Sequence, residues 1–198
     1  MINIKVKLVQ WTDNPVKLLA DIASICYGKE EASNPEKLVR NLNALEHHSV
    51  FEHAHYTFYI KGISRACLAQ LTRHRHASYT VRSQRYCDES EQEFLIPIMA
   101  LDNQEQLEVI RSTLDIINSS YKNLIKSGVK REDARAILPQ ATATDLYMTC
   151  NLRELLHIYK LRTDTASQRE IQDLLYNMAN EVLDVNPELE FLFEKGEE

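Results

Sequence analysis

The alternation of apolar and polar residues predicts strands at two places in the chain. In residues 2–8, apolar and polar side chains alternate at every position. This period of two is typical of a strand with one buried face. Residues 51–62, FEHAHYTFYIKG, repeat this period. The apolar face of the second predicted strand comprises Ala54, Tyr56, Phe58 and Ile60. His53 and His55 are expected to share the opposite face, because successive side chains of a strand point to opposite sides.

Two short helices with clear start signals are predicted within residues 13–28 and 33–48. In each segment an asparagine precedes a proline, so Asn14 and Asn34 are expected to cap helices whose first residue is proline. Gly28 follows the first helix and is expected to lie just beyond its end. The buried stripe of the second helix is expected to comprise Leu38, Leu42 and Leu45.

The longest predicted helix covers residues 102–127 and ends before Gly128. Its apolar stripe comprises Leu107, Ile110, Leu114, Ile117, Tyr121, Leu124 and Ile125. The other elements predicted in the second half of the chain are a short strand at 93–97, helices at 131–138, 151–162 and 165–184, and an extended segment at 143–149.

Residues 64–75 are predicted to be helical with Ser64 as the amino-terminal cap, so that Arg73 and His74 fall at the carboxyl end. Residues 76–92 have no clear period and are predicted to form a loop. No linker or change of composition divides the chain. The sequence therefore predicts the α+β class: a single domain over residues 1–198, with a small antiparallel or mixed sheet and flanking helices.

Composition narrows the function classes. The 198 residues include 44% hydrophobic and 26% charged side chains, as in ordinary globular proteins, and no apolar run approaches the ~18 residues of a membrane span. The formal net charge of −6 argues against a broad nucleic-acid surface. The four cysteines are far apart, which favours reduced thiols and a cytoplasmic location. The four glycines form neither a dinucleotide-binding fingerprint nor a P-loop.

One segment, RHRHASYTVRSQRYC at residues 73–87, concentrates positive charge within this acidic chain. Its arginines are Arg73, Arg75, Arg82 and Arg85, and no acid occurs in residues 73–86. Guanidinium groups bind phosphate bidentately, so the segment is suited to a phosphate-bearing small molecule. Two alternatives are a solvated basic loop paired with the acids of CDESEQE, and a single-stranded RNA contact in which Tyr79 and Tyr86 stack bases.

Four histidines lie within nine residues, at 47, 48, 53 and 55. Two imidazoles on one strand face can bind a metal, so a metal hydrolase is a further alternative. The chain has no H-E-x-x-H helix and no evident carboxylate partner, and we therefore expect no metal.

Taken together, the motifs resemble the flavin-dependent thymidylate synthase family over roughly residues 45–175. RHR at 73–75, seven residues and then Ser83 with QRY fit the family signature RHR-x7-S. HHSVFEHAHYTF is similar to the family segment H-x-[ST]-x-F-E-H, and the segments SGVKREDARAILP, NLRELLHIYKLR and QREI follow in the family order.

The resemblance implies a reaction and a set of ligands. Family members bind FAD and convert dUMP to dTMP, with 5,10-methylenetetrahydrofolate as carbon donor and NADPH as reductant, in homotetramers whose subunits share sites. It implies an FAD site formed by Ser49, Arg73, His74, Arg75, His76, Asn151, Arg153 and His157. It implies a dUMP site formed by Gln70, Arg73, Ser83, Gln84, Arg85, Arg135 and Arg162. His47 corresponds to a histidine near the folate and the flavin.

The candidate catalytic residues are Arg162, Ser83 and His47. In the family route a cation activates the pyrimidine and no cysteine attacks it, and Arg162 is the residue expected to act on the pyrimidine. Ser83 is interpreted as a phosphate or pyrimidine donor. The chain departs from the family at Thr80 and Val81, where many members have Asn-Glu, and at His157, where Asn is common.

Overall fold

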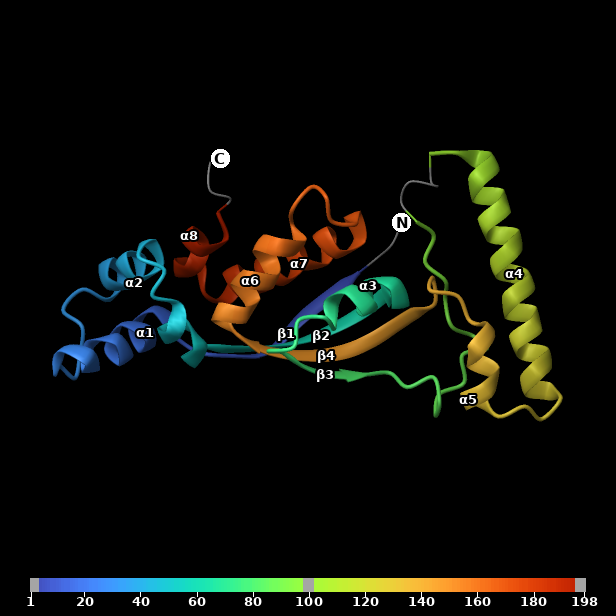
Figure 1. The fold of residues 1–198 in the computed structure, drawn as a ribbon, viewed down its shortest axis with the longest axis horizontal. Helices are drawn as coiled ribbons and strands as arrows, with labels where there is room; N and C mark the ends of the chain where they lie inside the picture. Colours follow the sequence, from blue (N-terminus) through green and yellow to red (C-terminus); the bar gives the residue numbers. More distant parts are fainter. Residues whose placement is uncertain (1–3, 98–101, 195–198) are drawn as a thin grey trace. The chain divides into compact units, whose positions relative to one another are not determined.

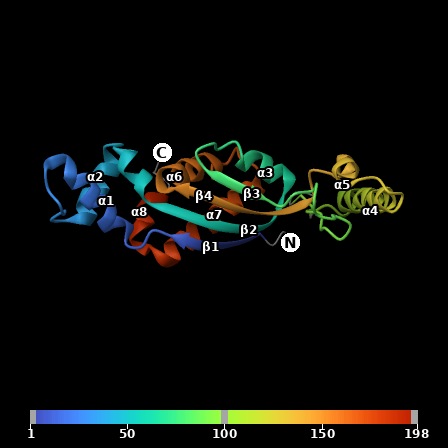
Figure 2. The same ribbon diagram turned by 90° about the horizontal axis from the view of Figure 1, so that it is seen from below.

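The computed structural model describes residues 4–97 and 102–194 (Figure 1). Four strands form one antiparallel sheet in the order β1-β2-β4-β3, which Figure 2 shows from below. The strands are β1 (Lys5–Trp11), β2 (His55–Ser64), β3 (Ser78–Val81) and β4 (Ala143–Asn151). Helices and strands together confirm the predicted α+β class.

Most helices lie at the predicted positions with slightly different bounds. They are α1 (Pro15–Ser24), α2 (Pro35–Ala44), α3 (Arg65–Leu71), α4 (Gln104–Lys126), α5 (Arg131–Ala134), α6 (Leu152–Arg162), α7 (Arg169–Val185) and α8 (Glu190–Phe193). Short 3-10 turns are η1 (Ile25–Tyr27), η2 (His48–His53), η4 (Arg135–Ile137) and η5 (Pro187–Leu189). Helix α8 was not predicted, and the predicted helix 131–138 is divided into α5 and the 3-10 turn η4. In the part of the chain that the structure describes, no helix is both long and apolar enough to cross a bilayer.

Side-chain caps explain where several helices begin. Asn34 accepts a hydrogen bond from the Lys37 amide at 3.1 Å, and Ser64 accepts one from the Cys67 amide at 3.0 Å. Asn14 occupies the predicted N-cap position of α1, but its side chain makes no capping hydrogen bond and its backbone is left-handed, with φ 45°. Pro15 nevertheless begins α1, and Gly28 follows η1 with φ 67°.

The described residues group into two compact units whose ranges interleave along the chain. The described part of the first unit comprises residues 4–5, 60–73, 80–97 and 102–146, hence α3, α4 and α5. The second contains residues 6–59, 74–79 and 147–194, hence the other helices. The single domain over 1–198 stays a prediction.

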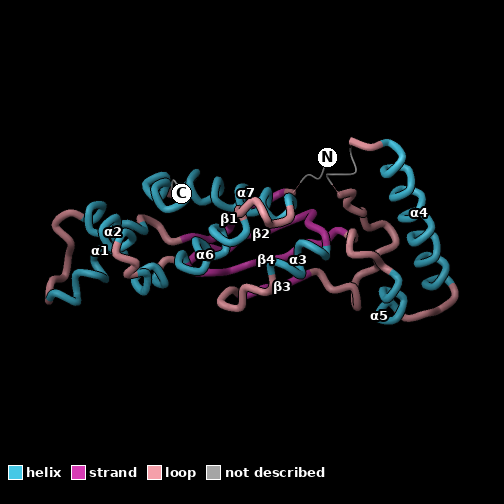
Figure 3. The backbone as a smooth tube through the Cα atoms, turned by 45° about the horizontal axis from the view of Figure 1, so that its top comes forward, coloured by secondary structure: helices cyan, strands magenta, loops and turns pink. Residues whose placement is uncertain are grey.

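The core of the second unit lies between β2 and the carboxyl-terminal helices. Ala54, Tyr56 and Phe58 are fully buried, which confirms the predicted apolar face, as does the burial of Ile60 at the start of the first unit. Helix α7 contributes the buried residues Ile171, Leu174, Leu175, Met178, Ala179 and Val182. Figures 1 and 3 show α6 and α7 side by side, and they show α1 and α2 as an adjacent pair.

In the first unit, α4 buries one stripe of its surface. Leu107, Leu114 and Tyr121 are buried, and the intervening stripe residues Ile110 and Ile117 are partly buried, as predicted. Gly128 follows the helix end with φ 90°, a conformation that glycine adopts without steric cost.

Four local predictions are wrong. His53 lies in η2, because this turn carries Phe51 into the core, so His53 and His55 do not share a strand face. Residues 78–81 form strand β3 within the predicted loop. The predicted strand 93–97 is reduced to a bridge between Phe94 and Thr142. Leu45 is 65% exposed because α2 ends at Ala44, and the buried positions of α2 are Val39 and Leu42.

Candidate functional site

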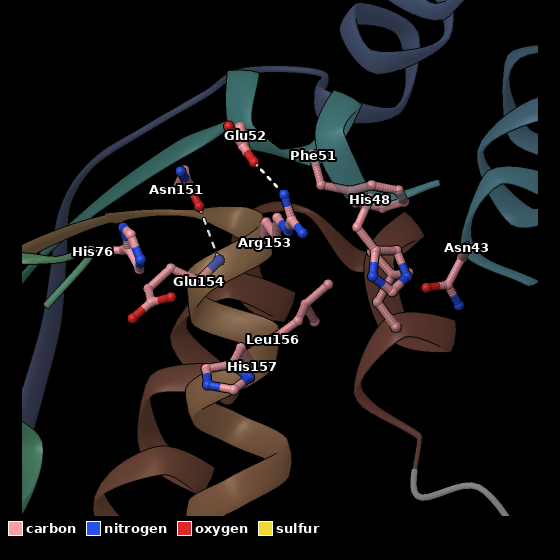
Figure 4. A pocket seen from close by; sticks show the side chains of 11 residues that line it. Asn43, His48, Phe51, Glu52, His76, Asn151, Arg153, Glu154, Leu156 and His157 are labelled. Atoms are coloured by element: carbon pink, nitrogen blue, oxygen red, sulfur yellow. Dashed lines mark hydrogen bonds and ion pairs between the residues drawn. The ribbon is translucent and has the colours of Figure 1, made fainter. Parts of the chain in front are cut away.

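A cavity of about 620 Å³ opens in the second unit beside the amino-terminal half of α6 (Figure 4). It is lined by Asn43, His48, Phe51, Glu52, His76, Asn151, Arg153, Glu154, Leu156, His157 and Leu192. Its volume is within the range of small-molecule sites, and both polar and apolar side chains line it. Of the residues that the family resemblance assigns to FAD, the structure brings together here His76, Asn151, Arg153 and His157.

Helix α6 presents the polar groups of this cavity because of how it begins. Asn151 ends β4 and accepts a hydrogen bond from the Glu154 amide at 2.8 Å, which fixes the first turn (Figure 4). Arg153 and His157 are four residues apart and therefore lie on the same side of the helix. The cavity is thus lined by side chains that a capped helix holds in place.

The guanidinium of Arg153 is oriented by an ion pair with Glu52. Its Nη1 donates to Oε1 of Glu52 at 2.5 Å, and both side chains are about half exposed (Figure 4). A guanidinium has five N–H donors, so this contact leaves Arg153 able to bind an anion as well. The donors of Arg153, His157 and Asn151 suit the phosphates and polar ring edges of a dinucleotide.

His74 and Arg162 contact each other within the second unit, next to His157 of the cavity lining. Nε of Arg162 donates to Nε2 of His74 at 2.9 Å, and the His74 ring meets the His157 ring edge to face with centroids 6.1 Å apart. His74 is 7% exposed. Burial, and then the positive charge of Arg162, lower the pKa of His74 to about 4, so the ring is neutral near pH 7.

Other residues predicted to bind FAD are not in the cavity lining. Ser49 lies in η2 and is exposed, and Arg75 is exposed in the turn after His74. His47 directly precedes η2 and is exposed. Arg73 belongs to the other unit and is exposed there.

In the first unit, three residues predicted to bind dUMP gather near Glu132 of α5. Arg85 forms an ion pair with the Glu132 carboxylate at 2.7 Å, and Nε of Arg135 donates to the Glu132 carbonyl at 3.1 Å. Oγ of Ser83 accepts a hydrogen bond from the Arg85 amide at 3.2 Å. Ser83 and Arg85 are thus in direct contact, and Arg85 and Arg135 both bind Glu132, the first through its carboxylate and the second through its main-chain carbonyl.

The two glutamines predicted to bind dUMP lie by the carboxyl-terminal half of α3. The side chain of Gln70 donates to the Ala66 carbonyl at 3.4 Å. Gln84 lines a smaller cavity of about 240 Å³ in the same unit. The other residues of that lining are Arg65, Leu68, Ala69, Thr72, Leu138, Pro139 and Gln140.

A buried ionic cluster supports the segment that carries Ser83 and Arg85. Nε of Arg82 binds Oε1 of Glu89 at 3.3 Å, and the Glu89 side chain is fully buried. Arg65 donates to the Arg82 carbonyl at 2.9 Å, and the Tyr121 hydroxyl accepts from the Glu89 amide at 3.3 Å. Pairing of the basic segment with the acids of CDESEQE, one of the alternatives above, is therefore correct for Arg82.

Sequence reasoning did not select several residues of these sites. Glu52 belongs to the FEH element of the resemblance, which is a signal that could have identified it. His48 lies in the histidine cluster and in the same family segment, whereas no motif marks Asn43 and Leu192, which line the cavity from distant parts of the chain. Val81 lies in β3. Its side chain has no carboxylate, whereas many members of the family have a glutamate at this position. Within residues 4–97 and 102–194, no three His, Cys, Asp or Glu side chains are arranged to hold a metal ion.

Comparison with known proteins places these observations in a family. Residues 7–188 match the family model described as thymidylate synthase complementing protein. The chain is 38% identical over 192 residues to a flavin-dependent thymidylate synthase of Pyrococcus furiosus, covering 90% of this chain and 79% of that protein. It is 37% identical over 194 residues to the enzyme of the same name from Geobacter sulfurreducens, covering 92% and 84% of the two chains.

Solved structures resemble the whole chain. A UMP/dUMP methylase from Streptomyces cacaoi bound with 5-Br dUMP matches with a TM-score of 0.83 and 26% identity, over 98% of this chain and 95% of the other. Thymidylate synthase X from Helicobacter pylori, solved with FAD and dUMP, matches with a TM-score of 0.80 and 26% identity, over 96% and 97%. Because the family model and these relatives span nearly all of its length, the chain belongs to the family of flavin-dependent thymidylate synthases.

Proposed function

We propose that this protein binds FAD and converts dUMP to dTMP, with 5,10-methylenetetrahydrofolate as carbon donor and NADPH as reductant. In the balanced reaction the methylene carbon of the folate becomes the methyl group that replaces the hydrogen at C5 of dUMP. NADPH supplies the two electrons, one proton is taken up, and tetrahydrofolate and NADP⁺ are released. The observation that carries the proposal is the arrangement in the second unit: a cavity lined by Arg153 and His157, with Arg162 held by the neutral His74 next to His157.

The residues of the cavity fit the cofactor. Asn151, Arg153 and His157 would hold its anionic and polar parts, since a guanidinium and an imidazole suit phosphate oxygens and an amide suits polar ring edges. Leu156 and Leu192, which are partly exposed, provide apolar surface for a ring system. When bound there, a flavin supplies reversible two-electron chemistry. The chain's own residues bind the cofactor and the substrate, orient them and stabilise the charge that develops.

Arg162 is the residue we assign to activation of dUMP. Methylation at C5 requires electron density at that carbon, and a cation at the N3–carbonyl edge stabilises the negative charge that develops on the pyrimidine. Arg162 is partly buried, so its charge acts in an environment with a lower dielectric than water. Its contact with His74 fixes one end of the guanidinium plane.

Substrate phosphate binding is assigned to the first unit. Arg85 and Arg135, which both contact Glu132, provide cations, and Ser83 provides a hydroxyl, with Gln70 and Gln84 as further donors. The Glu132 carboxylate competes with phosphate for Arg85, so dUMP must displace or share this contact. The homotetramer and a folate-side role of His47 are further parts of the proposal that rest on the family resemblance, and the location in the cytoplasm is a further part that rests on the widely spaced cysteines.

A visible spectrum of the purified protein tests the proposal directly. We expect a flavin absorption band at roughly 450 nm, and we expect dUMP to change its shape because substrate alters the surroundings of the flavin. A colourless protein that neither takes up added FAD nor binds dUMP would contradict the proposal.

We expect the thiols to be dispensable for catalysis. A nucleophilic thiol needs a lowered pKa, whereas burial raises the pKa of Cys150, with the Glu154 charge adding to the effect. Cys67 is also buried, and Cys87 is the cysteine nearest to the basic segment. Replacing Cys87 by alanine should therefore leave dTMP formation in place, as measured by turnover assays. An inactive, folded and FAD-loaded Cys87→Ala protein would show that thiolate chemistry operates.

Arg153→Ala is expected to weaken FAD binding. Loss of a hydrogen bond to a charged group typically costs about 1.5–3 kcal/mol, equivalent to roughly ten- to one-hundredfold in Kd. FAD titration followed by flavin fluorescence measures this change. Arg111→Ala, which removes an exposed arginine of α4, is the matched control. Equal FAD affinity in the two variants would remove Arg153 from the site.

A further inference from the structure

We propose that His74 is a positioning residue for Arg162, and that the unprotonated Nε2 of its ring accepts the Nε–H of that arginine and fixes the plane of the guanidinium. The inference rests on the proposed function, because it concerns how the arginine that activates dUMP is oriented. The family resemblance gives His74 a contact with FAD, whereas this inference assigns the ring a partner within the protein instead.

The hydrogen-bond geometry determines which atoms take part. Nε of an arginine can only donate, so His74 must accept through Nε2 across the distance of 2.9 Å. The ring proton must then be on Nδ1, which defines one tautomer. Because Nε lies in the guanidinium plane, a fixed acceptor at this atom limits rotation of the whole group.

The backbone around His74 holds the ring in place. The Tyr79 hydroxyl of β3 donates to the His74 carbonyl at 3.0 Å, and the Ala77 amide donates to the same carbonyl at 3.4 Å. On its other side, the ring meets the His157 ring of α6 edge to face. His74 is therefore buried and anchored by its main chain, although its neighbours Arg73 and Arg75 are exposed.

The surroundings keep the imidazole in its accepting form. The groups that face it are Arg162 and His157 from α6, and neither favours a positive charge on the ring. Together with burial they lower its pKa to about 4, well below the pH at which the enzyme would operate. A protonated ring would have no acceptor at Nε2 and would face a like charge.

Two variants separate the acceptor from the shape of the ring. His74→Phe keeps a ring and removes the acceptor, whereas the side-chain oxygen of His74→Gln can lie near the position of Nε2 and accept the same hydrogen bond. We expect His74→Phe to slow dUMP-dependent oxidation of the reduced flavin by about ten- to one-hundredfold, as expected for a lost hydrogen bond to a charged group. His74→Gln should recover part of this loss. Equal losses in the two variants would overturn the proposal.

A double-variant cycle tests whether His74 acts through Arg162. In an Arg162→Ala background the His74→Phe change should cause no further loss, because the partner that it positions is already absent. A full additional loss in the double variant would overturn the proposal, since it would mean that His74 acts directly on a ligand.

A measurement independent of activity completes the test. Nitrogen-15 NMR of the FAD-loaded protein is expected to show His74 with its proton on Nδ1 at neutral pH, and to show a slowly exchanging Nε–H of Arg162 that is lost in His74→Phe. A proton on Nε2 would contradict the proposal. The unsubstituted protein could show these NMR signals while the Arg162→Ala variant retains full turnover. In that case the hydrogen bond exists but the proposed activation of dUMP by Arg162 is wrong, so the two failures are distinguishable.

Discussion

Arg162→Ala is expected to slow the dUMP-dependent oxidation of reduced flavin by about 10²–10³, because it removes a preorganised donor from the place where negative charge develops. The effect arises in the transition state more than in the ground state, so the rate should fall more than dUMP affinity does. Reduction of the flavin by NADPH should persist. Stopped-flow measurement of the two half-reactions separates these quantities.

Arg162→Lys provides the matched comparison. An ammonium group keeps the charge but cannot reproduce the planar guanidinium or its contact with His74, so we expect only partial recovery. A purely structural arginine at the carboxyl end of α6 would instead contribute about 0.3–1 kcal/mol to stability through the helix dipole. Near-normal turnover in Arg162→Ala, with a small drop in Tm, would show that this structural role is the correct one.

Glu89→Ala is expected to lower the free energy of unfolding by about 1.5–3 kcal/mol, the usual contribution of a hydrogen bond to a charged group, because Glu89 is buried while Arg82 keeps partial access to water. The Glu89 side chain is fully buried against Arg82, and its charge offsets the effect of burial on Arg65, whose pKa burial lowers. Without the Glu89 carboxylate, the positive charges of Arg65 and Arg82 repel each other without compensation. Chemical denaturation monitored by circular dichroism measures the loss.

Glu91→Ala is the control for this prediction. Glu91 forms an ion pair with Lys122 at 3.0 Å, but its side chain is 90% exposed, and exposed pairs contribute only about 0–1 kcal/mol. Because the segment around Glu89 also carries Ser83 and Arg85, we further expect the KM for dUMP to rise in Glu89→Ala and to stay unchanged in Glu91→Ala. Equal stabilities of the two variants would contradict the role of the buried cluster.

Local signals predicted most of the elements. The cap-and-proline pattern predicted α2, and the period of two predicted the buried face of β2, because both depend on residues close together in the sequence. The errors have physical causes as well. Phe51 enters the core from a 3-10 turn, and β3 has only four residues without a fully buried face, so neither produces a readable period.

The candidate site was predictable as a list of residues but not as an arrangement. His74 and Arg162 are 88 positions apart, and no local pattern relates them. The pairing of Arg153 with Glu52 spans 101 positions and depends on η2 packing beside α6. A family motif names such residues one by one, whereas their hydrogen bonds and charge states follow only from the folded chain.

The most direct test of the proposed function is a single turnover without oxygen. The FAD-loaded protein is reduced with NADPH, freed of excess reductant and mixed with dUMP and 5,10-methylenetetrahydrofolate, and the nucleotides are then analysed by mass spectrometry. We predict oxidised flavin and dTMP in amounts equal to the reduced flavin at the start. Flavin that stays reduced, with dUMP recovered unchanged, would contradict the proposed function.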